Sequence, residues 1–133
     1  VQGGTSTTYF NVTPGNNGVN IPGVEATITP KSNSSRILVM INLNIRITQN
    51  SFFYFGFRRY VNNNLSSTTS NLVNYNIESS GGRYDGISYS YIDHPNSTGS
   101  VSYRALAESG SAAASFDLNR AGGNSTIQLL ELA

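Results

Sequence analysis

Residues 37–48, with the sequence ILVMINLNIRIT, decide the fold class because their apolar side chains recur at every second position. This period places one continuous apolar row on one face of an extended strand. Leu38 and Met40 make the other face apolar in the first half of the segment, so that half is predicted to be covered from both sides. The row consists of Ile37, Val39, Ile41, Leu43, Ile45 and Ile47, and the polar residues opposite it are Asn42, Asn44, Arg46 and Thr48.

The same two-residue period recurs along the rest of the chain, and helical periodicity is almost absent. Turn signals separate about eight short strands at intervals of roughly 8–12 residues, which is typical of a sandwich or barrel. A helix over residues 105–114 is rejected despite its alanines, because Gly110 and Ser111 interrupt it. The sequence therefore predicts an all-β fold, a two-sheet antiparallel β-sandwich, and a jelly roll fits the strand count best. The other strands are expected at residues 24–28, 53–61, 87–91, 101–107, 112–118 and 127–132.

The composition excludes several classes of protein. Charged residues make up 11% of the 133 positions, well below the roughly 25% of an average soluble domain, and the net charge is +1. The basic residues are scattered, whereas a nucleic-acid-binding protein normally carries a basic stripe. No run of 18 apolar residues is present, so no membrane insertion is expected. The chain has no cysteine, which excludes thiol chemistry, and its polarity comes mainly from 47 Ser, Thr and Asn residues.

No pattern of catalytic or metal-binding residues stands out. His94 is the only histidine, and Asp93 is poorly placed to orient it, because adjacent side chains on an extended chain point apart. Residues 93–95 are interpreted as a turn in which the Asp side chain bonds the backbone ahead of it. Glu78 and Asp85 are the nearest approach to a paired-carboxylate site, but two solvated loop acids explain them better. We therefore expect no enzyme activity, no metal and no cofactor.

The stretch 62–83 is predicted to be a long Asn- and Ser-rich loop, with at most one short strand near residues 72–77. Long loops on a rigid sheet scaffold are where binding usually resides. Tyr and Asn suit sugar recognition, because a ring stacks on a pyranose face while an amide bonds hydroxyl groups. The alternative is a surface loop without a ligand. The candidate ligand-binding residues are Tyr75, Arg83, Tyr84 and Asp85.

Aromatic residues occupy both faces of one predicted strand, in the segment FFYFGF at residues 52–57. A two-layer sandwich covers only one face of each sheet, so aromatic second faces are candidates for a subunit interface. The alternative is that the tyrosine hydroxyls lie at the solvent edge of an ordinary core, and the pattern favours self-association over it. The candidate interface residues are Tyr54, Tyr89, Tyr91 and Tyr103.

Three blocks of the sequence resemble blocks that recur in one family. Residues 28–40 read ITPKSNSSRILVM, similar to ITPKSSSSKILVMV. Residues 89–95 read YSYIDHP and, with Ser102-Tyr103, resemble YLDSP…TYKV. Residues 125–133 read STIQLLELA, similar to TTLTLMEIA. In this order and spacing, which span residues 19–133, the blocks resemble C-terminal domains of phage structural proteins that are frequent in cyanophages.

The resemblance implies a jelly-roll head similar to those of tumour necrosis factor and C1q, usually trimeric, that caps a tail fibre or another virion projection. Its partners would be other copies of the chain, other virion proteins and a host-surface glycan, and the family supplies no catalytic residues. The alternative is a capsid decoration or cement protein of the same fold. Residues 1–18 are then a lead-in segment before a single head domain at 19–133, and Val1 in place of Met fits a head that follows a shaft. His94 stands where the family usually has Ser.

Overall fold

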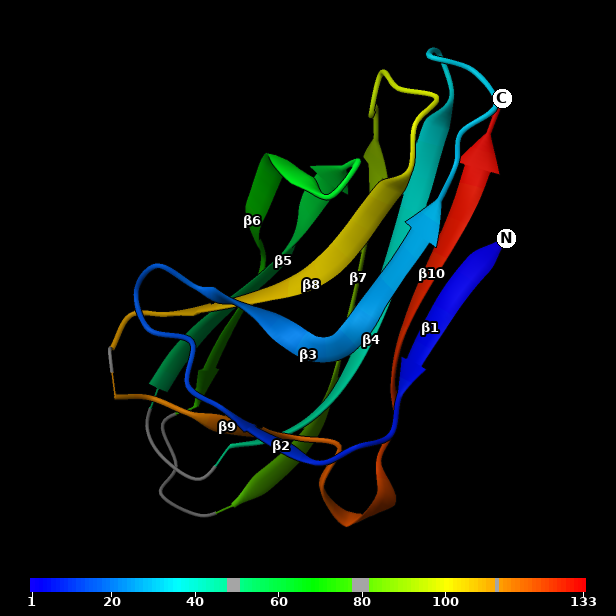
Figure 1. The fold of residues 1–133 in the computed structure, drawn as a ribbon. Coiled ribbons are helices and arrows are strands. Elements are labelled where there is room, and N and C mark those ends of the chain that lie inside the picture. Colours follow the sequence, from blue (N-terminus) through cyan, green and yellow to red (C-terminus); the bar gives the residue numbers. More distant parts are fainter. Residues whose placement is uncertain (48–50, 78–81, 112) are drawn as a thin grey trace.

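The computed structural model of the protein describes residues 1–47, 51–77, 82–111 and 113–133. Two antiparallel sheets pack face to face (Figure 1), which confirms the all-β sandwich predicted from the period of two. The first sheet contains β1 (Gln2–Ser6), β2 (Phe10–Val12), β4 (Arg36–Ile47), β7 (Arg83–Asp93), β9 (Phe116–Leu118) and β10 (Ser125–Leu132). The second sheet contains β3 (Val19–Ile28), β5 (Ser51–Val61), β6 (Asn64–Ile77) and β8 (Val101–Ser109). A short 3-10 helix, η1 (Arg120–Gly122), lies between β9 and β10.

Strand β4 organises the first sheet because it is paired along both edges. One edge pairs with β7 over residues 37–47, and the other pairs with β10 over residues 36–42 and with β9 at residues 45–46. β1 lies beyond β10, and β2 lies beyond β9. The second sheet has the order β3-β8-β5-β6. The two chain ends lie at one end of the sandwich, and the β2–β9 pair lies towards the other (Figure 1).

The apolar row of β4 faces the second sheet, as its period predicts. Its six branched side chains are 0–2% exposed, and burying each contributes about 1.5–3 kcal/mol before the entropic cost of folding. Phe53, Phe55 and Phe57 of β5 are buried in the same layer from the other side. Phe116 of β9 meets Phe53 edge-on, with ring centroids 5.3 Å apart. The core therefore combines an aliphatic row on one sheet with an aromatic row on the other.

The prediction of a long loop over residues 62–83 is wrong, because residues 64–77 form the 14-residue strand β6. Asn62 and Asn63 both have positive φ (49° and 66°), so a two-residue hairpin turn joins β5 to β6. Asn-Asn is a weaker turn signal than Asn-Gly, and an edge strand of Ser, Thr and Asn lacks a clear apolar period. Of the predicted loop, residues 78–81 lie outside the described residues.

The segment predicted as a lead-in, residues 1–18, contributes two strands to the first sheet. β1 pairs with β10, and β2 pairs with β9. Residues 105–109 continue β8 as an extended strand, which confirms that the alanines there do not form a helix, and Ala112 lies outside the described residues. In the part of the chain that the structure describes, no helix is long and apolar enough to cross a membrane.

Candidate functional site

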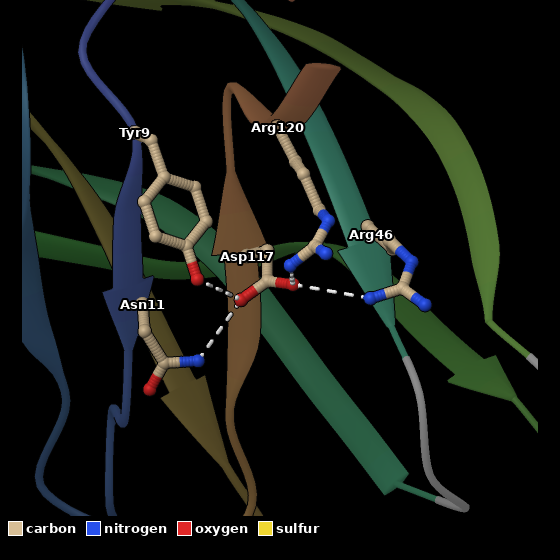
Figure 2. Close-up of polar contacts among 5 residues, drawn as sticks. All are labelled: Tyr9, Asn11, Arg46, Asp117 and Arg120. Carbon is tan, nitrogen blue, oxygen red and sulfur yellow. Dashed lines mark hydrogen bonds and ion pairs between the residues drawn. The ribbon is translucent and has the colours of Figure 1, made fainter.

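A row of polar side chains crosses four strands of the first sheet. The strand registers set Asn11 of β2 opposite Asp117 of β9, and Asp117 opposite Arg46 of β4. Arg46 is in turn opposite Tyr84 of β7. Directly opposed residues project from the same face of a sheet, and here it is the face turned away from the core. We call the Asp117 cluster the set of Tyr9, Asn11, Arg46, Tyr84, Asp117 and Arg120, all but Tyr84 drawn in Figure 2.

Asp117 is the centre of this cluster, and both of its carboxylate oxygens accept hydrogen bonds (Figure 2). Oδ1 accepts from the Tyr9 hydroxyl and from the Asn11 side-chain amide, each at 3.0 Å. Oδ2 accepts from Nη1 of Arg46 at 3.4 Å and from Nη1 of Arg120 at 3.2 Å. The carboxylate thus holds four side chains from three different segments in fixed positions.

Two tyrosine rings flank the arginines of the cluster. The Arg46 guanidinium carbon lies 5.6 Å from the centre of the Tyr84 ring, and that of Arg120 lies 6.0 Å from the centre of the Tyr9 ring. Both distances are within the range of cation–π attraction. Tyr9 and Tyr84 remain about half exposed, at 50% and 53%. The cluster therefore presents aromatic faces and guanidinium edges together at the surface.

The turn that carries Arg120 is held by a buried asparagine. Asn119 adopts the left-handed conformation (φ 58°), which asparagine tolerates better than most residues. Its amide nitrogen donates to the Ser6 hydroxyl and the Thr8 carbonyl, both at 3.0 Å, and its amide oxygen accepts from the Ser125 hydroxyl at 2.8 Å. A buried amide with these three partners fixes the turn, and with it the start of the Arg120 side chain.

Both charge types in the cluster are stabilised in their ionised forms. Burial opposes ionisation of Asp117, but the hydrogen bonds from Asn11 and Tyr9, the charge of Arg120 and the hydrogen bond from Arg46 together hold its pKa below 3.8, its ordinary value. The pKa of Arg120 is raised, first by the nearby Tyr84 hydroxyl and then by the charge of Asp117. The cluster thus carries two cations and one anion at neutral pH.

We expect Asp117→Asn to reduce the loss of stability in acid. A folded-state pKa below the unfolded value means that the unfolded chain binds more protons, so ionised Asp117 stabilises the fold at neutral pH and this contribution disappears as the pH falls through the folded pKa. Urea unfolding of both proteins between about pH 7 and pH 2 measures this. The wild type should lose stability more steeply below about pH 4. Parallel curves for the two proteins would contradict the expectation.

The structure separates the predicted ligand-binding residues into two groups. Tyr75 lies on β6 in the second sheet and packs against the core. Arg83, Tyr84 and Asp85 lie on β7 in the first sheet, where Arg83 and Asp85 form an ion pair at 2.8 Å. Of the four, only Tyr84 belongs to the Asp117 cluster. Sequence reasoning missed its other members, because no local pattern marks residues that strand register alone brings together: Tyr9, Asn11, Arg46, Asp117 and Arg120.

Tyr103 belongs to a buried network between the sheets, so its assignment to a subunit interface is wrong. The Tyr103 side chain is completely buried within a single copy of the chain. Its hydroxyl donates a hydrogen bond to Oδ2 of Asp93 at 2.8 Å. Nη1 of Arg59 on β5 donates to both carboxylate oxygens of Asp93, at 2.9 and 2.8 Å. Burial and then the charge of Asp93 raise the pKa of the Tyr103 hydroxyl, which keeps it a donor. Asp93 thus bonds across the sandwich and not, as predicted, to the backbone ahead of it.

The other three predicted interface tyrosines are distributed differently. Tyr89 is half-buried, and its hydroxyl donates across the sandwich to the Gly56 carbonyl at 2.8 Å. Burial raises the pKa of this hydroxyl. Tyr91 is 41% exposed on β7, and Tyr54 is half-buried on the outer face of β5. Tyr91 and Tyr54 therefore retain surface that another copy of the chain can contact.

Of the groups considered for catalysis, the structure describes His94 and Asp85. His94 is exposed after β7, and its backbone carbonyl accepts a hydrogen bond from Arg59 at 3.2 Å. Glu78, considered as a partner for Asp85, lies outside the described residues. Among the described residues, no group of three His, Cys, Asp or Glu side chains is placed to hold a metal ion.

No protein-family model matches the chain, and no curated protein matches it.

Proposed function

We propose that the protein is the head domain of a phage tail fibre or of a similar virion projection. It contacts the host surface, it has the jelly-roll topology of the tumour-necrosis-factor and C1q heads, and it works as a homotrimer without catalysing a reaction. Its ligand on the host is a surface glycan, bound weakly at single sites and strengthened by three-fold avidity.

The observation that carries this proposal is the placement of the three blocks that resemble phage structural domains. Residues 28–40 run from the end of β3 into the first half of β4, residues 89–95 include the end of β7, and residues 125–133 include all of β10. Val39 of β4 is paired with Tyr91 of β7 and with Leu129 of β10. Segments far apart in the sequence that share one resemblance therefore form three adjacent strands, as parts of one structural unit do.

The strand order supports the jelly-roll part of the proposal. The first sheet contains the series β1-β10-β4-β7, and the second contains β3-β8-β5-β6. In both series, strands from the two halves of the chain alternate. This alternation arises when a long antiparallel ribbon wraps into a two-sheet sandwich with Greek-key connections.

The free edge of β6 supports the oligomeric part of the proposal. In the described structure β6 pairs only with β5, so one long edge of unpaired backbone groups faces outwards. Its 14 residues include no charged residue and no proline. Natural proteins protect such an edge with charges, proline, bulges or a covering segment. Of these devices, β6 has two irregularities in its register with β5. A neighbouring copy of the chain is the covering segment that we propose, and exposed Leu65 lies on this edge.

We expect Leu65→Lys to shift the trimer towards monomers at micromolar concentration, because it places a charge where the neighbouring copy would bury an apolar side chain. Light scattering of the purified chain measures the mass. Thr13→Lys adds the same charge at an exposed position between β2 and β3 and should leave the trimer intact. A wild-type chain that is monomeric under these conditions refutes the trimer, and an intact Leu65→Lys trimer excludes the β6 edge from the interface.

Electron microscopy of intact phage tests the position of the protein on the particle. A gold-tagged antibody against this domain should label the tips of the tail fibres or other projections. Label spread over the head would refute the host-contact role and make the protein a capsid decoration protein. In that case, removing the domain should lower the temperature at which the heads burst.

A further inference from the structure

Counted over the residues that the structure describes, the Asp117 cluster carries one uncompensated positive charge at the surface. Arg46 and Arg120 both contact Oδ2 of Asp117, so two cations share a single carboxylate. Arg83, which precedes Tyr84 in the sequence, forms its ion pair with Asp85 of the same strand, with Nε of Arg83 2.8 Å from Oδ2 of Asp85. Asp85 therefore neutralises Arg83. One further monoanion would therefore balance the charge of the cluster.

Each arginine of the cluster also keeps hydrogen-bonding capacity. A guanidinium has five N–H donors, and each of the two arginines gives one nitrogen, Nη1, to Asp117. The Arg120 side chain is 46% exposed and that of Arg46 is 24% exposed. The planar donor fork matches a carboxylate, which it binds through two parallel hydrogen bonds.

A glycine leaves room for the Arg46 guanidinium. A Cβ atom built on Gly82 would lie 2.5 Å from Nη2 of Arg46, so any side chain at residue 82 forces the guanidinium to move. Asp117 and the Asn119 turn hold the charged groups in place before a ligand arrives. Groups that are already ordered lose less conformational entropy on binding.

We infer that the Asp117 cluster is a binding site for an acidic sugar. The carboxylate of a uronic acid residue is placed between Arg46 and Arg120, and its pyranose ring lies against the exposed faces of Tyr9 and Tyr84. A monoanion matches the single excess charge, and the aromatic faces distinguish a sugar acid from a free small anion. This inference rests on the proposed host-contact role only for the source of the sugar, an acidic polysaccharide of the host surface.

The test is a calorimetric titration of the purified chain with trigalacturonic acid and with its carboxyl-reduced form, galactotriose. The two sugars differ only in their carboxylates. The acidic sugar should bind at least about tenfold more tightly, since hydrogen bonds between a guanidinium and a carboxylate are stronger than those to a neutral hydroxyl. Higher salt should weaken the binding of the acidic sugar only. Equal binding of the two sugars, or no binding of the acidic one, overturns the inference.

Three variants locate the site. Arg120→Gln should weaken trigalacturonic acid binding at least about tenfold, and Gly82→Ala should weaken it by displacing Arg46 without removing a charge. Arg36→Gln, at the other end of β4, is the matched control and should bind like the wild type. Unchanged binding by Arg120→Gln and Gly82→Ala, with all variants unfolding at the wild-type temperature, overturns the inference.

The outcomes separate this inference from the proposed function. If the domain labels the fibre tips and does not distinguish the two sugars, the acidic-sugar site is refuted and the host-contact role stands. If the domain is absent from the projections but the Arg120 variant loses acidic-sugar binding, the site stands and the host-contact role is refuted.

Discussion

Asp93→Ala is expected to lower the free energy of unfolding by about 3 kcal/mol, at the lower end of what removing one partner of a buried ion pair costs. The side chains of Arg59 and Asp93 are only 14% and 10% exposed. Without the carboxylate, the Arg59 guanidinium loses its counter-charge and the Tyr103 hydroxyl loses its acceptor. For a domain of this size, the midpoint of thermal unfolding should fall on the order of 10 °C.

Asp85→Ala is the matched control for this prediction. It removes a carboxylate from the same strand, β7, and an ion pair of the same length, but its partner Arg83 is 64% exposed. Water replaces the lost partner there, so the change should stay within about 1 kcal/mol. Equal destabilisation by the two variants in urea would show that the buried network has no special role.

A second comparison separates the cost of an unpaired charge from the value of the pair itself. Replacing Arg59 and Asp93 together by leucine removes both charges and leaves the Tyr103 hydroxyl as the buried group without its partner. The His94 carbonyl and the Ser66 hydroxyl also lose Arg59, but both residues are exposed and water can replace it. We expect the double variant to be more stable than Asp93→Ala, since well-packed apolar groups often replace a buried ion pair without loss. A double variant that is less stable than the single one would contradict this.

Gly56→Ala is expected to destabilise the protein by about 3 kcal/mol or more, at the upper end of what overpacking costs. The register between β5 and β6 shifts between Phe55 and Phe57, and residues 70–72 lie opposite Gly56. A Cβ atom at residue 56 would collide with the backbone carbonyl oxygen of Thr69. Backbone cannot move aside as a flexible side chain does, so the β5–β6 pairing itself must distort.

The effect of Gly56→Ala extends to the packing of the two sheets. The Gly56 carbonyl accepts the hydrogen bond of the half-buried Tyr89 hydroxyl from the opposite sheet. A shift of β5 at this point leaves that hydroxyl without its acceptor, which adds a further penalty.

Gly86→Ala provides the control for the backbone collision. Gly86 also lies within a strand, β7, and no atom lies within 4 Å of the Cβ position there. The substitution should be neutral or should stabilise the fold by roughly 0.5–1 kcal/mol, because alanine loses less backbone entropy than glycine. Denaturant midpoints of the two variants and the wild type measure the contrast, and similar midpoints for Gly56→Ala and the wild type would contradict it.

Local sequence was sufficient to predict the strands that have a buried face. The apolar row of β4 and the phenylalanines of β5 face the core as their spacing indicates, because burial of alternate side chains leaves a period of two in the sequence. The sequence does not predict β6 in full because this strand lacks such a period of apolar residues. It lies at an edge, its residues are mostly Ser, Thr and Asn, and its hydrogen bonds to β5 leave no trace in side-chain type.

The sequence by itself thus determined the fold class, the orientation of the buried rows and the end of β7 at Asp93. The tertiary structure decided which polar residues became neighbours. One row on the first sheet contains Asn11, Asp117, Arg46 and Tyr84. Tyr103, predicted to lie at a subunit interface, instead belongs to the buried network with Asp93. The physical reason is that alternation depends on each residue and its nearest neighbours along the chain. Register depends on the pairing of strands far apart in the sequence, as for Asn11 and Asp117, which are 106 residues apart.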